Sequence, residues 1–167
     1  MSTSEFRTAV YTGSFDPITL GHLSVIQRSS RLFDHIVIGI GINVEKTPLF
    51  SPEERIDLVQ RTTASLDNVE VRTFTGLAVN FVRECNSRIM VRGLRPLTDI
   101  AGEFTMMMAN RQLDADIETV FLMADEQFAH VSSTLIKQIT PLSSDDKLAR
   151  FVPSEIIADL RKKIPQQ

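Results

Sequence analysis

Four short segments of the sequence carry side chains suited to binding phosphate groups. They are Gly13 to Pro17 (GSFDP), Thr19 to His22 (TLGH), Arg92 to Arg95 (RGLR) and Ser132 to Thr134 (SST). Glycine lets backbone N–H groups approach a ligand closely, and an arginine presents a planar pair of donors that matches a phosphate. Hydroxyl side chains at the start of a helix add further donors. The segments therefore predict a phosphate-binding site if the fold brings them together.

His22 stands in the first turn of an expected helix, where unpaired backbone N–H groups and the positive end of the helix dipole favour an anion. Both of its ring nitrogens are able to donate, and the dipole should disfavour the protonated imidazolium unless a bound anion compensates. Gly21 would let a ligand approach the backbone closely. The alternative is a surface histidine beside an ordinary loop glycine, because T-x-G-H is short enough to occur by chance. Ser132 likewise could be only the N-cap of a helix.

The basic residues also leave two interpretations open. Arg92 and Arg95 could clamp phosphates, or they could pair with nearby carboxylates such as Asp99 and Glu103. Lys46 lies in a loop, where a lysine is usually solvated. The sequence segments by themselves do not decide between these roles.

The elements that must position these residues follow from the apolar patterns. Strands are expected at 6–12, 35–42, 69–74, 88–92 and 118–123, and helices at 21–33, 52–66, 77–85, 99–113, 132–139 and 152–164. Ser51, Pro52 and Glu54 form a capping box at the start of the second helix. Strands that alternate with helices predict an α/β fold, a doubly wound five-stranded parallel sheet with helices on both faces, as one domain over residues 1–167. Ligands of such sheets lie beyond the carboxyl ends of the strands, where the strand order reverses.

The composition excludes several classes of protein. The 167 residues carry a formal charge of −3, so nothing draws the whole chain toward nucleic acid. No apolar run approaches the roughly 18 residues of a membrane helix, and the first residues lack the pattern of a signal peptide. Cys85 is the single cysteine, which rules out an intrachain disulfide and a Cys₂ or Cys₄ metal site. We therefore expect a cytoplasmic protein with no membrane and no nucleic-acid partner.

Several other features have structural interpretations. The chain has no G-x-x-x-x-G-K-[S/T] segment, and Gly39 and Gly41 lie inside an expected strand rather than before a helix. Met106 to Met108 should be core or a subunit contact, and Cys85 should be buried and inert. His35 and His130 have no partners at ligand spacing, so no zinc site is expected. Residues 145–146 and 161–163 should be solvated surface.

Taken together and in this order, the four segments resemble those of the nucleotidylyltransferase superfamily that carries an H/T-x-G-H signature. Along nearly its whole length the sequence is most similar to the bacterial phosphopantetheine adenylyltransferase family. The segments that single out this family are 15–19 (FDPIT), 50–55 (FSPEER), 91–95 (VRGLR) and 120–123 (VFLM).

The resemblance implies an adenylyltransferase that joins ATP and 4′-phosphopantetheine, giving dephospho-coenzyme A and pyrophosphate. It implies Mg²⁺, carried mainly by the ATP phosphates, and a homohexamer. Within this resemblance His22 would bind the α-phosphate and steady the transition state, and Ser14 would touch both phosphate groups. Lys46 and Arg92 would clamp the phosphopantetheine phosphate, and Arg95 would face the ATP phosphates.

The resemblance also implies two sets of contacts. The residues expected to bind ATP are Ser14, Phe15, His22, Arg92, Gly93, Leu94, Arg95, Glu103, Phe128, Ala129, His130, Val131, Ser132, Ser133 and Thr134. Those expected to bind the phosphopantetheine substrate are Ser14, Lys46, Leu77, Ala78, Arg92 and Asn110, and Asp99 is a further candidate.

Three positions depart from the family pattern. Gly102 stands where an aromatic residue is common, Ala78 where a larger apolar residue is common, and Ala124 to Phe128 where proline and tryptophan are often found. Two alternatives stay open. A sister enzyme on the same scaffold would transfer AMP or CMP to nicotinamide mononucleotide or glycerol phosphate, and a non-enzyme would sense nucleotide or coenzyme A without turnover.

Overall fold

The computed structural model describes residues 6–95 and 99–166 and contains one parallel five-stranded sheet of order β3-β2-β1-β4-β5. The strands are β1 (Thr8–Gly13), β2 (His35–Gly41), β3 (Val69–Phe74), β4 (Ile89–Leu94) and β5 (Glu118–Met123). The chain builds outward from β1 to β3 and then returns to the other side of β1. The strand order therefore reverses between β1 and β4, as expected for a doubly wound fold.

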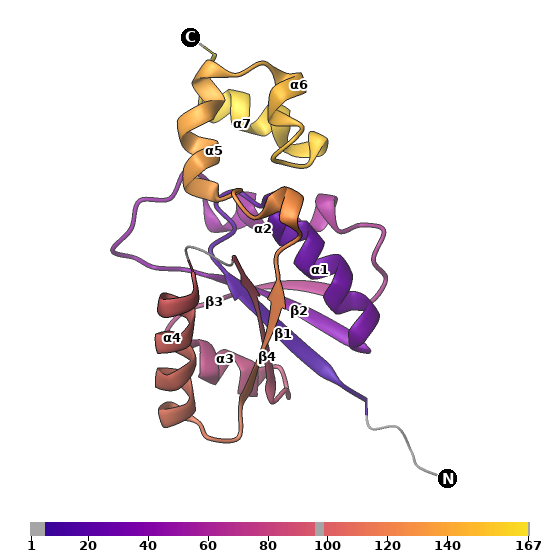
Figure 1. The fold of residues 1–167 in the computed structure, drawn as a ribbon, viewed down its shortest axis with the longest axis vertical. Helices are drawn as coiled ribbons and strands as arrows, with labels where there is room; N and C mark the ends of the chain where they lie inside the picture. The colour runs from indigo at the N-terminus through magenta and orange to yellow at the C-terminus, as the bar shows by residue number, and fades with distance from the viewer. Residues whose placement is uncertain (1–5, 96–98, 167) are drawn as a thin grey trace.

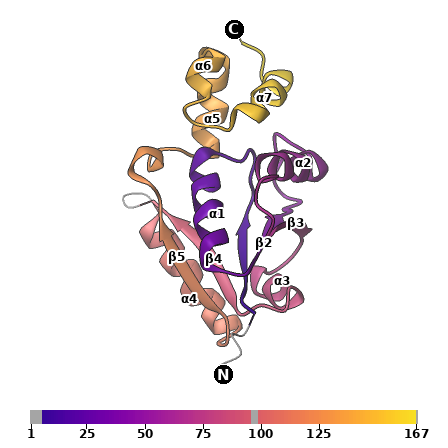
Figure 2. The same cartoon turned by 90° about the vertical axis from the view of Figure 1, so that its right-hand side faces the viewer.

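Helices cover both faces of the sheet (Figures 1 and 2). Helices α1 and α2 pack on one face, and α3 and α4 lie on the other. The helices are α1 (Leu20–Leu32), α2 (Pro52–Thr62), α3 (Ala78–Glu84), α4 (Ile100–Leu113), α5 (Ser133–Ile139), α6 (Asp145–Leu148) and α7 (Ile157–Lys163). Three 3₁₀ turns, η1 (Glu126–Phe128), η2 (Thr140–Leu142) and η3 (Ser154–Ile156), join the later elements.

The side-chain alternation of the strands divides the core into two apolar clusters. In β1, Tyr11 faces α1 and belongs to the larger cluster, whereas Val10 faces α3 and belongs to the smaller one. In β4 the neighbours Val91 and Met90 divide in the same way. The period of two that defines a strand thus assigns neighbouring residues to opposite layers.

The carboxyl-terminal helices extend the larger cluster beyond the sheet. Ile136, Leu148 and Leu160 come from α5, α6 and α7, and all are fully buried in it. Figure 1 shows these three helices grouped at one end of the molecule. The backbone N–H of Leu20, at the start of α1, donates to the Phe151 carbonyl at 2.9 Å. The group is therefore tied to the first turn of α1, which contains His22.

The expected elements are confirmed, with differences at their ends. The expected helix at 52–66 ends at Thr62, where the hydroxyls of Thr62 and Thr63 bond to the carbonyls one turn earlier. The expected helix at 152–164 begins as the turn η3, and α6 was not expected. The expectation of solvated surface at 161–163 is wrong for Arg161, which donates to the carbonyls of Thr140 and Ser143.

The methionine run and the cysteine fall short of full burial. Met106 and Met108 are 56% and 44% exposed on α4, so a place in the core of this chain is wrong for both. Cys85 is only partly buried, and burial raises the pKa of its thiol. The outer face of α4 is apolar over most of its length.

Candidate active site

Two cavities meet where the strand order reverses, at the carboxyl ends of β1 and β4. The larger has a volume of about 600 Å³ and the smaller about 320 Å³. They share one wall, made of Thr12, Gly13, Ser14, Arg92 and Glu103. A group held in one cavity can therefore meet a group held in the other at this wall.

His22 lies on the smaller cavity, and its ring orientation is fixed by the start of α1. The backbone N–H of Thr19 donates to His22 Nδ1 at 3.1 Å, and the His22 N–H donates to Thr19 Oγ1 at 3.3 Å. This is a capping box in which histidine occupies the position usually held by glutamate. Because Nδ1 accepts a hydrogen bond, the neutral ring carries its proton on Nε2. One ring nitrogen, rather than both, is thus available as a donor.

The surroundings keep the His22 imidazole neutral. Burial, followed by the positive charges of Arg95 and Arg92, lowers the pKa of His22 to about 4. The shift has the direction expected at a helix start, and its largest cause is burial of the ring. Behind the ring, Phe15 takes a positive φ of 46° and packs edge-on at 5.0 Å between centroids. His22 is therefore held as a neutral donor in a rigid setting.

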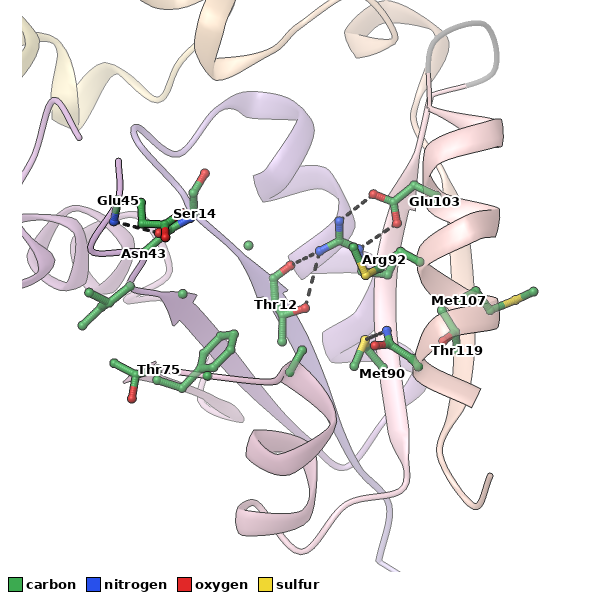
Figure 3. Close-up of a pocket in the computed structure, with 18 of the residues that line it drawn as sticks. Thr12, Ser14, Asn43, Glu45, Thr75, Met90, Arg92, Glu103, Met107 and Thr119 are labelled. Atoms are coloured by element: carbon green, nitrogen blue, oxygen red, sulfur yellow. Dashed lines mark hydrogen bonds and ion pairs between the residues drawn. The ribbon is translucent and has the colours of Figure 1, made fainter. Parts of the chain in front are cut away.

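Arg92 is held by a carboxylate in the shared wall (Figure 3). Its Nε and Nη2 donate to the two oxygens of Glu103 at 2.8 and 2.5 Å. Its Nη1 donates to the Thr12 carbonyl at 2.6 Å. The interpretation that these arginines pair with nearby carboxylates is confirmed as a contact. Arg92 nevertheless remains 28% exposed and lines both cavities.

Arg95 repeats this arrangement at the smaller cavity. Its Nε and Nη2 donate to the Asp99 carboxylate at 2.7 and 2.9 Å, and its Nη1 donates to the Val131 carbonyl at 3.2 Å. Two hydroxyls of the fourth segment, Ser132 to Thr134, also have structural partners. Ser132 caps α5 by accepting from the Leu135 N–H, and Ser133 donates to the Pro17 carbonyl.

Asp16 joins two loops and helix α5 behind the site. Its carboxylate accepts from the backbone N–H groups of Leu49 and Phe50, both at 2.9 Å, and pairs with Lys137 of α5 at 2.6 Å. Asp16 is 5% exposed. The loops after β1 and β2 are therefore fixed to each other and to the helix that follows Ser132.

Arg55 of α2 holds the backbone behind the shared wall. Its guanidinium is buried, and Nη1 donates to the carbonyls of Ser14 and Gly41 at 2.9 and 3.3 Å. These carbonyls belong to the ends of neighbouring strands. Arg55 thus holds the backbone of Ser14 while leaving the Ser14 side chain exposed at both cavities.

The larger cavity has an apolar interior and polar residues at its mouth. Met90, Met106, Met107 and Phe74 line it, and Phe74 stacks on Phe81 at 4.6 Å between centroids. Asn110 is 8% exposed at its wall, close to the sulfur of Met90. Such a cavity suits an extended, largely apolar arm that carries a charged group at the end near Arg92.

Most residues expected at the site line these cavities. The smaller is lined by Ser14, His22, Arg92, Gly93, Arg95, Asp99, Glu103, Phe128, Val131, Ser132, Ser133 and Thr134. The larger is lined by Ser14, Ala78, Arg92 and Asn110. Six expected residues are not on these walls: Phe15, Lys46, Leu77, Leu94, Ala129 and His130.

For three of these six residues the structure shows why they do not line the cavities. Phe15 is fully buried beneath His22, so its ring supports the site instead of lining it. Lys46 is exposed in the loop after β2, although its neighbours Val44 and Glu45 line the larger cavity. His130 packs edge-on against Phe151 and is exposed.

Nothing in the packing around Gly102 requires a glycine at this position, where the family commonly has an aromatic residue. A Cβ on Gly102 would meet nothing within 4 Å, and Gly102 lies on the exposed side of α4. Ala124 and Phe128 both line the smaller cavity.

Sequence reasoning missed four functional or supporting residues. Tyr11 and Thr12 line the smaller cavity, and Arg55 and Lys137 support the loops. Tyr11 and Thr12 lie in a buried strand, and Arg55 and Lys137 lie within helices, so no local pattern marks them. A carboxylate in a Gly-rich loop could have suggested that Asp16 needs a cationic partner.

The described residues contain no group of three or more His, Cys, Asp or Glu side chains placed to hold a metal ion. Over the same part of the chain, no helix is both long and apolar enough to cross a bilayer.

Comparison with known proteins places this arrangement in context. The cytidylyltransferase-like family model matches residues 10–139. The phosphopantetheine adenylyltransferase of Rhodopirellula baltica is 70% identical over 157 residues, covering 93% of this chain and 88% of that protein. The enzyme of the same name from Clostridium beijerinckii is 44% identical over 158 residues, covering 95% and 98%.

Solved structures support the fold. A Plasmodium falciparum nicotinic acid mononucleotide adenylyltransferase, complexed with NaAD, matches with a TM-score of 0.64 at 12% identity, covering 95% of this chain and 96% of that one. A putative nicotinate-nucleotide adenylyltransferase from Vibrio parahaemolyticus matches with a TM-score of 0.65 at 17% identity, covering 95% and 93%. At these identities the likeness concerns the fold alone.

Proposed function

This chain belongs to the phosphopantetheine adenylyltransferase family, and from that membership we propose how its two cavities carry out the family's reaction. The enzyme transfers the adenylyl group of ATP to the 4′-phosphate of phosphopantetheine, giving dephospho-coenzyme A and pyrophosphate in the penultimate step of coenzyme A synthesis. The observation that carries the proposal is the wall shared by the two cavities, because the two reacting phosphates must meet.

ATP occupies the smaller cavity and phosphopantetheine the larger one. The apolar interior of the larger cavity suits the pantetheine arm, with Ala78 and Asn110 on its walls. The smaller cavity offers the neutral His22 donor, Arg95 and the hydroxyls at the start of α5. Both phosphates then lie against Ser14 and Arg92, which belong to both cavities.

The reaction needs alignment more than proton transfer. An oxygen of the 4′-phosphate forms a bond to the α-phosphorus of ATP, and the bond from that phosphorus to the bridging oxygen breaks, so its electron pair leaves with pyrophosphate. The nucleophile is already largely a dianion near neutral pH, since its second pKa is about 6. No general base is required, which fits a site whose histidine is neutral and lies on the ATP side. Holding two mutually repelling anions in line is the main task of the protein.

His22 acts at the transferring phosphorus. Its Nε2–H donates to the α-phosphate, and this donor is already oriented before substrate arrives because Thr19 fixes Nδ1. Preorganised donors stabilise the charge that builds up in the transition state. Arg92 and Arg95 add positive charge on either side. Lys46, in the loop at the mouth of the larger cavity, reaches the 4′-phosphate when phosphopantetheine is bound.

Mg²⁺ carried in with ATP would be held mainly by the ATP phosphates, and it would supply positive charge to the pyrophosphate that leaves. Two observations support this. Asp99 and Glu103, the carboxylates among the described lining of the smaller cavity, are each held by an arginine. Mg²⁺ also keeps several waters and prefers substrate phosphates to an all-protein cage. Removal of divalent ions with a chelator should abolish turnover without unfolding the protein.

The proposal extends to a cytoplasmic homohexamer. The outer face of α4 exposes Ile100, Phe104 and Met108 at 44–57%, and Leu113 at 55%. Exposed apolar surface of this kind marks a protein contact. Light scattering on the purified protein should give six times the mass of the chain, and Phe104→Glu should lower that mass.

Pyrophosphate release tests the function directly. Mg·ATP is offered with 4′-phosphopantetheine, pantetheine without its phosphate, nicotinamide mononucleotide or glycerol phosphate, and His22→Ala runs as the control. Turnover with phosphopantetheine alone, lost in His22→Ala, is the expected result. Turnover with another acceptor would support the sister enzyme instead, and nucleotide binding without any turnover would support the sensing protein.

A further inference from the structure

Tyr11 presents a polar group to the smaller cavity that no residue of the described chain uses. The side chain is 5% exposed and lines that cavity from β1. No hydrogen bond between described residues involves its hydroxyl. The hydroxyl oxygen is not fully enclosed either, unlike Ser29 Oγ and Arg55 Nε, which are buried without a partner. A nearly buried hydroxyl without a protein partner is costly unless something else bonds to it. The hydroxyl therefore faces space that a ligand can fill.

The neighbouring backbone keeps this hydroxyl uncovered. A Cβ built on Gly93 would lie 3.4 Å from Tyr11 Oη and 3.0 Å from Val25 Cγ2. A side chain at position 93 would thus contact the hydroxyl and press against Val25 of α1. Glycine at this position leaves the tyrosine open to the cavity.

Packing holds the Tyr11 ring, and this fixes the position of the hydroxyl oxygen. Tyr11 packs edge-on against Phe15, with 5.3 Å between centroids and 88° between planes. Phe15 packs in turn against His22. Burial raises the pKa of the Tyr11 phenol well above its usual value. The hydroxyl is therefore protonated at any working pH, and it can both donate and accept a hydrogen bond.

We propose that the Tyr11 hydroxyl forms a hydrogen bond with an oxygen of the bound nucleoside triphosphate, an assignment that rests on the proposed function of the smaller cavity. Tyr11 lines that cavity and not the larger one, because it faces α1 while its neighbours Val10 and Met90 face α3. The hydroxyl is a neutral donor, as are the hydroxyls of Ser14 and Thr134 that line the same cavity. It adds to ATP binding and takes no part in the bond-making step.

The composition supplies a direct signal for this contact. Tyr11 is the single tyrosine, and the chain has no tryptophan. The long-wavelength phenol absorption of the whole protein therefore comes from Tyr11 alone. A hydrogen bond to the phenol shifts that band, and Tyr11→Phe carries no phenol, so it gives the blank for nucleotide absorbance.

The experiment combines this spectrum with steady-state kinetics on the intact enzyme. Mg·ATP is titrated into wild type and Tyr11→Phe without phosphopantetheine, and the difference spectrum is recorded. The expected result is a shift of the phenol band that saturates with ATP. In Tyr11→Phe the KM for ATP should rise about three- to tenfold, with kcat and the KM for phosphopantetheine within about twofold of wild type, because one neutral hydrogen bond is lost.

Thr62→Val is the matched control, since it removes a hydroxyl that bonds to the Leu58 carbonyl within α2, outside both cavities. Its KM for ATP should equal that of wild type. An unshifted phenol band, an unchanged KM for ATP in Tyr11→Phe, or an equal rise in both KM values would each overturn the assignment. If wild type binds no ATP and releases no pyrophosphate, the proposed function itself fails, which is distinct from a failure at Tyr11 alone.

Discussion

Arg92 and Glu103 form a two-point ion pair across the wall that separates the two cavities, with Nε–Oε2 and Nη2–Oε1 distances of 2.8 and 2.5 Å. The pair fixes the plane of the guanidinium, and a third contact to the Thr12 carbonyl fixes its position. Glu103 therefore orients Arg92 toward both cavities and balances its charge before the anionic substrates bind.

Loosening this pair should reduce catalysis. Glu103→Gln keeps the size of the side chain but offers Arg92 one acceptor in place of two. We expect kcat to fall about tenfold, because a less constrained guanidinium aligns the phosphates less well. Steady-state kinetics with both substrates measure this. A variant with wild-type kcat would show that Glu103 does not orient Arg92.

His22 should make the stability of the protein depend on acid pH. Its pKa falls from 6.5 in the unfolded chain to about 4 in the fold, so between these values the unfolded state binds more protons. The contribution is complete above pH 6.5 and is lost as the pH falls toward 4. Denaturant unfolding at both pH values should show a loss that is about 2–3 kcal/mol larger in wild type than in His22→Gln. An equal loss in both proteins would contradict the lowered pKa.

Gly21 lines the smaller cavity opposite Phe128. A Cβ there would lie 3.5 Å from Thr19 Oγ1 and 3.8 Å from Phe128, so the protein itself has room for alanine. Gly21→Ala should therefore fold normally while its methyl group narrows the cavity. We expect the KM for ATP to rise at least about tenfold with little change in the KM for phosphopantetheine. An unchanged KM for ATP would place the nucleotide elsewhere.

Asp16 and Lys137 should be energetically coupled. Asp16→Asn is expected to destabilise the protein by about 2 kcal/mol, because an amide offers one acceptor oxygen for the two backbone N–H groups that Asp16 now binds, and Lys137 loses its ion-pair partner. Lys137→Met should cost about 1 kcal/mol, and the double variant less than the sum of the two. Lys162→Met breaks an exposed pair with Asp159 at 3.5 Å and should change stability little. Strict additivity at positions 16 and 137 would contradict the coupling.

Gly102 offers a stabilising substitution. It lies inside α4, exposed, with nothing within 4 Å of an added Cβ. Gly102→Ala should raise the free energy of unfolding by about 0.5–1 kcal/mol, since alanine favours the helix over the unfolded chain. Thermal unfolding should shift upward by a few degrees with kcat unchanged. A lower melting temperature would show that position 102 meets a contact absent from the isolated chain.

Local patterns predicted the frame of the fold closely. The strands at 69–74 and 118–123 have the expected bounds, and Ser51 with Glu54 forms the expected capping box. Apolar periodicity and caps are local signals, so a sequence states them directly. The α6 helix and the bonds of Arg161 escaped notice because they depend on how the carboxyl-terminal segment folds back on itself.

The site was predictable where its residues stand in loops and not where they stand in regular elements. Ser14, His22 and Arg95 were found from loop chemistry and from the resemblance together. Tyr11 and Arg55 resemble ordinary strand and helix residues, and only the packing of the whole chain brings Tyr11 to the smaller cavity and Arg55 to the Ser14 carbonyl. The pairing of both arginines with carboxylates was stated only as an alternative, because sequence distance does not show which side chain meets which.

The hydrogen bonds between Thr19 and His22 begin helix α1 and also decide which imidazole nitrogen holds the proton. The residue at position 19 is consequently required both for the start of the helix and for the orientation of the His22 ring. A substitution there that weakened the helix start would also free the ring to change tautomer or turn away from the nucleotide. Variation at position 19 is therefore restricted for reasons of activity as well as of folding, and a lineage could change it only together with a new means of holding His22.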